Sequence, residues 1–186
     1  MRIVEIKEKK VGFHTSIRNS VVDFSEVTGS IVAVVTDVQK NGQPVVGLGF
    51  NSIGRYAQSE IILNRLVPRI MRASPEDLLN QEQTNFDPVK ISGIMMKNEK
   101  PGGHGDRAHA VGAIEMALWD AVAKIEGKPL WKHLSDKYNG GAYDEKVFTY
   151  AAGGYYYPGK GIDALKNEIK SYLDRGFTKV KMKIAG

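Results

Sequence analysis

Residues 146–186 place the strongest restriction on the fold, because they read as a strand, a helix and a second strand. The stretch KVFTYAAGG (146–154) predicts the first strand, and GIDALKNEIKSYLDRG (161–176) places apolar residues at helical spacing. The stretch TKVKMKI (178–184) alternates lysine with apolar residues, which is the period of a second strand. Two such strands joined by a helix run parallel, with a right-handed crossover. A parallel sheet of only two strands is not stable, so this pattern predicts the start of a larger sheet or barrel.

The residues before this unit predict a domain of a different kind. Residues 1–50 contain three strand-like runs, with a long uneven stretch after the first and the turn NGQP after the second, which indicates a three-stranded meander. Residues 57–138 carry apolar residues at helical spacing, most regularly in DRAHAVGAIEMALWDAVAKIEGKP, where Gly127 predicts the end of the helix. We therefore expect an α+β domain over residues 1–140, followed by an incomplete barrel domain over residues 141–186.

Prolines and capping residues predict helix boundaries within the first domain. Pro68 interrupts the helical spacing of AQSEIILNRLVPRIMR, so that helix is expected to kink or end there. Ser74 is expected to cap a helix that begins at Pro75, because serine at the N-cap and proline at the first helical position are both favoured. Asp87 begins another helix with the same arrangement in DPVKISGIMMKN.

The composition excludes several classes of protein. The 186 residues include no cysteine, which excludes disulfide scaffolds and thiolate chemistry, and 42% hydrophobic with 25% charged residues is typical of a globular chain. The start MRIVEIKEKKVGF has no apolar signal core, and no apolar run approaches membrane-spanning length, so we expect a cytoplasmic protein with no membrane partner. The net charge is +5, but the lysines and arginines are spread along the chain without a nucleic-acid-binding motif. An acidic small molecule is therefore the expected partner, and nucleic acid is not.

The lysines of the last strand are the first candidates for chemistry. Lys179, Lys181 and Lys183 share one face of the strand, and the other face is apolar. A solvated edge strand is one explanation, since lysines at an edge discourage pairing with other chains. In a parallel unit, however, the apolar face packs against the covering helix, and in a closed barrel the lysine face points inward. Two ammonium groups at positions i and i+2 repel each other there, which favours the uncharged amine that a general base requires.

Other polar stretches give weaker signals. PGGHGDR (101–107) lacks the residues that end a phosphate-binding loop and is expected to be a flexible loop before the long helix. Glu115 and Asp120 are interpreted as solvated or helix-stabilising charges. GGYYYPGK (153–160) follows a strand of the parallel unit, where loops line active sites, so its tyrosines are either site residues or packing residues. Four histidines show no metal-ligand spacing: His14, His104, His109 and His133.

Several stretches together resemble a known family. A meander, a helical set that ends in AVGAIEMALWDAVAKIEGKPLWKHL, and a βαβ unit that ends in Lys-x-Lys are similar to the mandelate racemase/muconate lactonizing branch of the enolase superfamily. The stretches IRNSVVDF, GFNSIGRYAQ, MMKNEKPGGHGDR, YAAGGYYYPGK and VKMKIAG further resemble the D-tartrate dehydratases of that branch, and the likeness runs nearly end to end. The resemblance implies an enolase-like capping domain followed by a (β/α)7β TIM-like barrel. It also implies a dehydratase that removes the proton α to a carboxylate with the assistance of Mg2+.

The resemblance further implies roles for individual residues. Lys183, the second lysine of KMK, would be the base, and Lys181 would neutralise the substrate or tune its neighbour. Asn19 and Lys100 would reach the substrate from the capping domain, and Tyr155 would reach it from the first barrel loop. The substrate would be a small acid sugar or dicarboxylate.

The long connection 11–29 would be the mobile specificity loop, and the protein would act as a homo-oligomer or in association with the rest of the barrel.

Two departures from the family pattern affect the substrate and the metal. Ile53 stands where the D-tartrate dehydratases carry a polar residue such as Asn, which leaves another acid-sugar dehydratase or a racemase of the branch as alternatives. The family's metal ligands lie on later barrel strands, which these 186 residues do not include. The chain alone is therefore expected to be inactive, as part of a longer enzyme or as a remnant that serves as an interaction module.

Overall fold

The computed structural model describes residues 1–51, 56–102 and 104–184. They form two compact units. The first unit combines Met1–Val11 with Thr28–Tyr143, and the second combines Gly12–Val27 with Asp144–Gly186. Residues 12–27, which connect the first two strands and were expected to belong to the first domain, are therefore part of the second unit.

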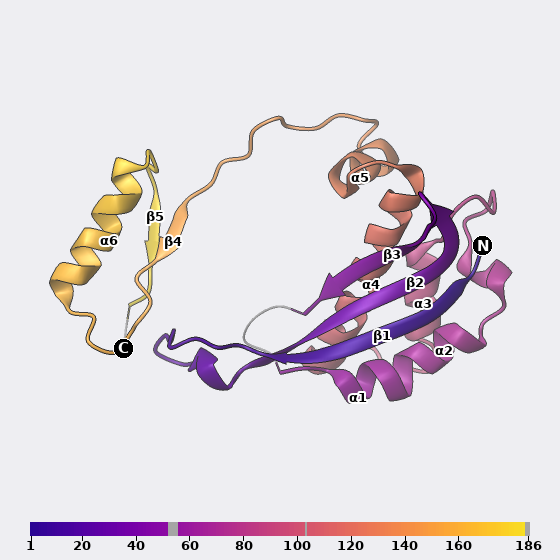
Figure 1. The fold of residues 1–186 in the computed structure, drawn as a ribbon, viewed down its shortest axis with the longest axis horizontal. Helices are drawn as coiled ribbons and strands as arrows, with labels where there is room; N and C mark the ends of the chain where they lie inside the picture. The colour runs from indigo at the N-terminus through magenta and orange to yellow at the C-terminus, as the bar shows by residue number, and fades with distance from the viewer. Residues whose placement is uncertain (52–55, 103, 185–186) are drawn as a thin grey trace. The chain divides into compact units, whose positions relative to one another are not determined.

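A three-stranded sheet in the order β1-β2-β3 forms one layer of the first unit (Figure 1). Its strands are β1 (Ile3–Gly12), β2 (Thr28–Lys40) and β3 (Gln43–Phe50). β2 and β3 are antiparallel, and the register pairs Ile31 with Phe50 near one end and Lys40 with Gln43 at the other. The turn between them has φ angles of 52° at Asn41 and 74° at Gly42, the left-handed conformation that a two-residue hairpin requires. The predicted meander is confirmed.

Helices form the other layer of this unit, with α4 packed across the sheet (Figure 1). The elements are α1 (Ser59–Ile61), the π-helix η2 (Ile62–Leu66), α2 (Val67–Arg72), the 3-10 helix η3 (Pro75–Leu78), α3 (Pro88–Met95), α4 (Gly105–Glu126) and α5 (Leu130–Tyr138). Pro68 does not end its helix, which continues to Arg72. The π-helical turn before Pro68 has a wider hydrogen-bond pattern, which accommodates a residue without an N–H group and with a bulky ring.

The two capping predictions have different outcomes. Asp87 caps α3 as predicted, because its Oδ1 accepts hydrogen bonds from the N–H groups of Val89 at 3.0 Å and Lys90 at 3.1 Å. Ser74 occupies an N-cap position, but its hydroxyl donates to Asp77 Oδ2 at 2.9 Å and accepts from no backbone N–H group. The element that follows is one short 3-10 turn, so the predicted serine cap is wrong: the hydroxyl is used by the neighbouring carboxylate instead.

α4 lies directly on β3 because β3 carries glycine at two alternate positions. A Cβ atom on Gly47 would lie 1.9 Å from the carbonyl oxygen of Ala117, and one on Gly49 would lie 2.2 Å from that of Ala113. Backbone therefore meets backbone at this interface, and a side chain on the strand has no room. α4 ends at Gly127, whose left-handed φ of 70° confirms the predicted end of the helix.

Side chains of α4 also form hydrogen bonds with backbone groups on the outer edge of β3. Asp120 Oδ2 accepts a hydrogen bond from the Leu48 N–H at 2.8 Å, and Lys124 Nζ donates to the Val46 carbonyl at 3.0 Å. The two side chains form an ion pair, with 2.6 Å between Lys124 Nζ and Asp120 Oδ2. The interpretation of Asp120 as a solvated or helix-stabilising charge is incomplete, because Asp120 also blocks a strand edge that could pair with another chain.

Apolar side chains from both layers form the core of the first unit. Its largest fully buried members include Val32, Val34, Ile62, Leu66, Ile70, Phe86, Ile91, Met95, Ile114 and Leu118. The other face of the β2–β3 hairpin is also apolar, but Ile31, Leu48 and Phe50 are exposed there. One face of the sheet therefore lies in the core, and the other face is apolar and exposed at Ile31, Leu48 and Phe50.

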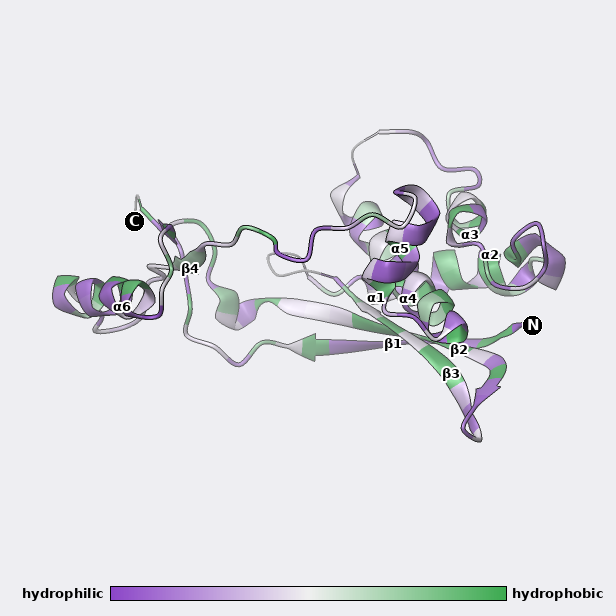
Figure 2. Ribbon diagram, turned by 90° about the horizontal axis from the view of Figure 1, so that it is seen from above, coloured by the Kyte–Doolittle hydropathy of each residue, from purple (hydrophilic) through white to green (hydrophobic). Residues whose placement is uncertain are grey.

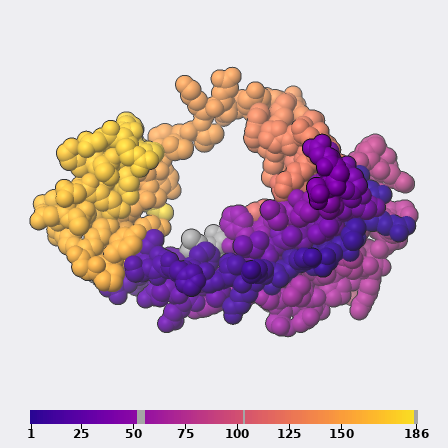
Figure 3. All heavy atoms as spheres, in the orientation of Figure 1, coloured from indigo at the N-terminus to yellow at the C-terminus, as the bar shows by residue number. Residues whose placement is uncertain are grey.

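The second unit contains the predicted βαβ pattern. Its elements are η1 (Phe24–Glu26), β4 (Ala151–Gly153), α6 (Ile162–Asp174) and β5 (Val180–Met182). β4 and β5 are parallel, with Ala151 beside Val180 and Gly153 beside Met182. Figure 3 shows the atoms of this C-terminal part of the chain, in orange and yellow, as one small body. Both strands are shorter than predicted, because in the described part of the chain each has only the other as a partner.

α6 is amphipathic, with polar and apolar residues on different sides (Figure 2). Its predicted apolar face is only partly covered, since Ile162 and Leu173 are exposed. Val147 and Phe148, which were predicted to belong to the first strand, are also exposed. This apolar surface agrees with the expectation that the unit is the start of a larger parallel sheet.

Candidate active site

Lys181, the lysine within β5, lies on the face of the small sheet that is turned away from α6. Gly153 faces α6, because a Cβ atom there would lie 2.5 Å from the Tyr172 hydroxyl and 2.7 Å from Glu168 Oε1. Its register partner Met182 shares that face, so Lys181, one residue earlier, is on the other face and is exposed. This arrangement agrees with the expectation that the apolar residues of the strand meet the covering helix.

A short ribbon joins the connection between β1 and β2 to the loop that follows β4. Arg18 lies at its centre and forms bridges to Asp23 and to Tyr156. The bridge to Tyr156 is antiparallel, with 3.2 Å from Arg18 N to Tyr156 O and 3.0 Å from Tyr156 N to Arg18 O. In this register Asn19 comes opposite Tyr155. The ribbon therefore brings together two residues for which the resemblance implies substrate contacts.

The side chain of Asn19 is oriented by the turn in which it lies. Its Oδ1 accepts hydrogen bonds from the N–H groups of Val21 and Val22, both at 2.8 Å. Oδ1 is occupied in this way, whereas the Nδ2 group donates to no residue that the structure describes. Asn19 thus presents an NH2 donor, which suits an oxygen of a carboxylate or hydroxyl group.

Tyr155 lies between an aromatic ring and an ammonium group. The ring of Phe24 meets it edge to face, with 6.3 Å between ring centroids and an angle of 80° between the planes. Lys183 Nζ lies over the Tyr155 ring, 4.7 Å from its centroid, in a cation–π contact. Lys183 is half-buried and forms no ion pair within the described ranges. We refer to Asn19, Phe24, Tyr155 and Lys183 as the Tyr155 cluster.

Phe24 is the member of the cluster that the sequence analysis did not single out. It follows Asp23, whose Oδ1 accepts hydrogen bonds from the Ser25 hydroxyl at 2.7 Å and the Ser25 N–H at 2.9 Å. These hydrogen bonds, from the hydroxyl first, hold the pKa of Asp23 below its usual value. They also stabilise the 3-10 turn that carries Phe24. A lone aromatic residue in an otherwise polar turn is the signal that would have identified it.

Lys100, the remaining residue with an implied substrate contact, belongs to the first unit. It lines an open pocket of about 670 Å³ together with Arg65, Asn98, Glu99, His104 and Arg107. Asp106 lines it too, so the charged side chains of the wall are Arg65, Lys100 and Arg107 against Glu99 and Asp106, a small positive excess that suits an anionic ligand. Lys100 therefore lies in surroundings that agree with its implied role.

Glu99, next to Lys100, is the centre of a buried ion-pair network. Its side chain is only 2% exposed and meets Arg65 of η2, Arg69 of α2 and Arg107 of α4. Arg69 Nη1 lies 2.8 Å from Oε1, and Arg107 Nη1 lies 3.0 Å from Oε2. The hydrogen bonds from these guanidinium groups, Arg65 first, lower the pKa of Glu99 to about 2. One carboxylate therefore joins three helical segments and holds the backbone beside Lys100.

Replacing Glu99 with Gln is expected to destabilise the first unit at pH 7, because the guanidinium groups of Arg65, Arg69 and the buried Arg107 lose their shared counter-ion. The pKa of Glu99 is depressed in the folded chain, so its stabilising contribution is complete above about pH 4.5 and is lost as the pH falls toward about 2. The difference in urea midpoint between wild type and Glu99→Gln should therefore shrink over this interval.

The control is Glu5→Gln, which makes the same chemical change in the exposed pair between Glu5 and Lys7. It should change the urea midpoint little at any of these pH values. A Glu99→Gln midpoint equal to that of wild type at pH 7 would contradict the role assigned to the network.

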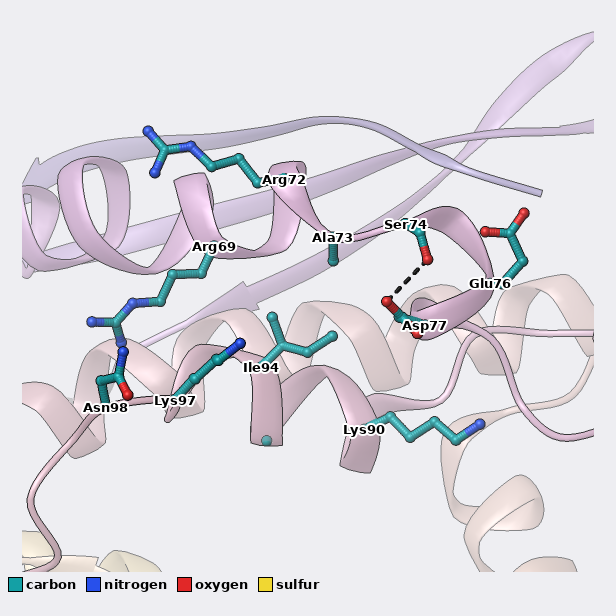
Figure 4. Close-up of a pocket in the computed structure, with 11 residues that line it drawn as sticks. Arg69, Arg72, Ala73, Ser74, Glu76, Asp77, Lys90, Ile94, Lys97 and Asn98 are labelled. Carbon is teal, nitrogen blue, oxygen red and sulfur yellow. Dashed lines mark hydrogen bonds between the residues drawn. The ribbon is translucent and has the colours of Figure 1, made fainter.

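A second hollow lies between α2, η3 and α3, with a volume of about 880 Å³. Its polar side chains do not converge on one point (Figure 4). Arg72 points away from α3, Arg69 reaches toward Asn98, and Ser74 is hydrogen-bonded to Asp77 (Figure 4). A ligand there would find no common set of donors, so this hollow is the weaker candidate for a site.

Mg2+ is the metal ion that the resemblance implies. Within residues 1–51, 56–102 and 104–184, no group of three or more histidine or acidic residues is placed to hold a metal ion. These residues therefore do not fit a Mg2+ site.

In the same ranges, no helix combines the length and the apolar character needed to span a bilayer.

A sequence model of the N-terminal domain of the mandelate racemase / muconate lactonizing enzyme family matches residues 17–134. The chain belongs to this family. Two relatives in sequence have names that describe dehydratases. A D-galactonate dehydratase family member from Paenibacillus sp. (strain JDR-2) is 28% identical over 160 residues, which are 86% of this chain and 34% of that protein. Arabinonate dehydratase from Saccharolobus solfataricus is 34% identical over 83 residues, 45% of this chain and 21% of that protein.

Solved structures of other enzymes share the fold. N-succinyl Arg/Lys racemase from Bacillus cereus aligns with a TM-score of 0.67 and 21% identity over 99% of this chain and 44% of that chain. L-Ala-D/L-Glu epimerase from Bacillus subtilis aligns with a TM-score of 0.65 and 18% identity over 99% of this chain and 45% of that chain. The expected enolase-like capping domain followed by the start of a parallel sheet is thus confirmed. The chain spans less than half the length of each of these relatives.

Proposed function

We propose that this chain is the N-terminal part of an acid-sugar dehydratase of the D-tartrate dehydratase kind, which converts tartrate to oxaloacetate and water. The observation that carries the proposal is the Tyr155 cluster. In it a half-buried lysine, a tyrosine and an oriented amide NH2 group come from segments far apart in the sequence. Family membership and the dehydratase names of the relatives support the same reaction class.

The proposed reaction gives each residue a task. Lys183 Nζ removes the proton α to a substrate carboxylate and becomes an ammonium group. The hydroxyl on the neighbouring carbon then takes a proton from this ammonium group and leaves as water, which restores the amine. The resulting enol rearranges to the keto acid. Asn19 Nδ2 and the Tyr155 hydroxyl donate hydrogen bonds to substrate oxygens, and Lys181 balances part of the negative charge. For Lys100, which belongs to the first unit, a substrate contact is proposed from the resemblance alone.

Mg2+ is the cofactor that the family resemblance implies for the complete enzyme. The described residues do not fit a site for it, so none of the steps above depends on a metal position. A cytoplasmic location and a homo-oligomeric state also stay predictions, as does the boundary near residue 140 between the two domains.

Two groups of substrates follow from different observations. D-Tartrate is the first, because the quoted stretches around Asn19, Lys100 and Lys183 resemble the D-tartrate dehydratases. Arabinonate and galactonate are the second, because the names of the relatives refer to them. Ile53, which bears on this choice in the sequence, lies outside the described residues. A racemase of the same branch would return the proton to the substrate without loss of water.

A role as an interaction module is the second candidate function. It is favoured by the exposed apolar residues on the free face of the β2–β3 hairpin, Ile31, Leu48 and Phe50. Monomeric proteins rarely leave a large continuous apolar patch in water. The two functions separate in a simple binding measurement: an enzyme part assembled with its barrel binds dicarboxylates, whereas a module binds a protein and no acid sugar.

The 186-residue chain by itself is expected to release no keto acid from D-tartrate, arabinonate or galactonate. The described residues include no metal-ligand cluster, so they offer no site for the Mg2+ ion that the resemblance implies for stabilising the negative charge on the substrate. The longest gene product that includes this sequence should release the keto acid from at least one of these substrates. Proton NMR measures the keto acid released by each of the two proteins, with and without Mg2+.

Mg2+-dependent release of oxaloacetate by the 186-residue chain would show that this assignment of parts is wrong. Binding to duplex DNA is measured in parallel at two salt concentrations. Tight binding that falls steeply with salt, together with no binding of dicarboxylates, would replace the enzyme proposal with a nucleic-acid function.

A further inference from the structure

Glu168 on α6 gathers hydrogen-bond donors from the loop that carries Tyr155. Its Oε1 accepts from the Gly154 N–H at 3.3 Å and from the Tyr172 hydroxyl at 2.8 Å. Its Oε2 forms a close ion pair with Lys160. Two of these donors, Gly154 and Lys160, stand at the two ends of the same short loop, so one carboxylate holds both ends.

Lys160 extends this contact to Tyr155 itself. Its Nζ donates to the Tyr155 carbonyl at 2.8 Å while it also pairs with Glu168. The N–H of the preceding residue, Gly154, is therefore bound to Glu168, and the carbonyl of Tyr155 itself is bound to Lys160. The backbone of Tyr155 is fixed on both sides by one ion pair.

We propose that Glu168 and Lys160 are positioning residues that hold Tyr155 against Phe24 and Lys183. This inference rests on the proposed function for its catalytic meaning, because Tyr155 and Lys183 are assigned to the reaction there. Neither Glu168 nor Lys160 touches the substrate in this scheme. Both act through the Tyr155 backbone and, through the Tyr155 ring, on the place of the Lys183 ammonium group.

The burial of this pair separates it from an ordinary surface ion pair. The side chains of Lys160 and Glu168 are 14% and 23% exposed, whereas those of Lys170 and Asp174 on the same helix are 71% and 61% exposed. Burial raises the pKa of Glu168, but hydrogen bonds from Lys160, Tyr172 and Gly154 outweigh it and lower the pKa overall. Glu168 is therefore held as a charged acceptor for the loop.

The first test uses the 186-residue chain and does not depend on activity. The Tyr155 ring current shifts the ε-methylene protons of Lys183 upfield in proton NMR, because Nζ lies 4.7 Å from the ring centroid. Glu168→Gln and Lys160→Met should each reduce this shift by at least half and speed amide exchange at Gly154 and Tyr156 about tenfold. Tyr172→Phe, which keeps the ion pair, should keep the shift, and so should the control Lys170→Met in the exposed pair.

The second test measures α-proton exchange by the complete enzyme. Glu168→Gln should lower kcat at least fivefold, and Lys170→Met should leave kcat unchanged. An unchanged Lys183 ring-current shift in folded Glu168→Gln and Lys160→Met would overturn the positioning proposal, whatever the activity. A lost shift in these variants, with no exchange by the wild-type enzyme on any acid sugar, would support the positioning and overturn the proposed function alone.

Discussion

Lys183→Ala is expected to abolish exchange of the substrate α-proton with deuterium in the complete enzyme. A positioned general base contributes on the order of 10²–10⁴-fold to such a step, and alanine provides no group that can take the proton. Lys183 is half-buried on the sheet face turned away from α6 and lies over the Tyr155 ring, so no neighbouring lysine occupies the same position. The rate is measured by NMR in D2O with D-tartrate or with whichever acid sugar the enzyme accepts.

Two variants make this result specific. Lys181→Ala should raise KM more than it lowers kcat, because Lys181 is proposed to balance substrate charge and not to take the proton. Lys170→Ala, which removes an exposed lysine on α6, should change neither parameter. If Lys183→Ala exchanges the α-proton at the wild-type rate, the base is another residue, and the proposed role of the cluster fails.

Gly47→Ala is expected to destabilise the first unit strongly. The added Cβ atom would lie 1.9 Å from the carbonyl oxygen of Ala117 and 2.7 Å from the Cβ of Ala121. Because backbone cannot turn aside as a flexible side chain can, α4 would have to move away from β3. The cost is expected at the upper end of the range for overpacking, about 3 kcal/mol. The urea midpoint at pH 7 measures it.

The matched control is Gly93→Ala, the same substitution within α3, where an added Cβ atom meets nothing within 4 Å. Alanine is the better helix former there, so this variant should gain roughly 0.5–1 kcal/mol. A Gly47→Ala chain as stable as wild type would show that α4 does not lie on β3 at the distance described. The opposite signs expected from one chemical change make the pair informative.

Local patterns in the sequence determined the type and order of most elements. Alternation at period two predicted the meander and the strand around Lys181, and spacing at period 3.6 predicted α4 and α6. Asp87 and Gly127 marked helix ends correctly, because a cap depends on only a few neighbouring residues. These features were predictable since they are settled within one or two turns of chain.

Two residues with more than one acceptable hydrogen-bond partner differ from what their local sequence predicts. Ser74 has the sequence of a cap but gives its hydroxyl to Asp77. Asp120 reads as a surface charge but accepts the N–H group of Leu48 on another element. In both cases two partners were chemically acceptable, and the positions of the surrounding elements selected one.

The residue types of the candidate site were likewise visible in the sequence, since Asn19, Tyr155 and Lys183 lie in stretches that resemble one family. Only the tertiary structure decided that they meet, and that Phe24 and Glu168 belong with them. The physical reason is that the meeting depends on a backbone bridge between Arg18 and Tyr156 and on packing against α6. Such contacts join segments distant along the chain, and no local periodicity or capping pattern encodes them.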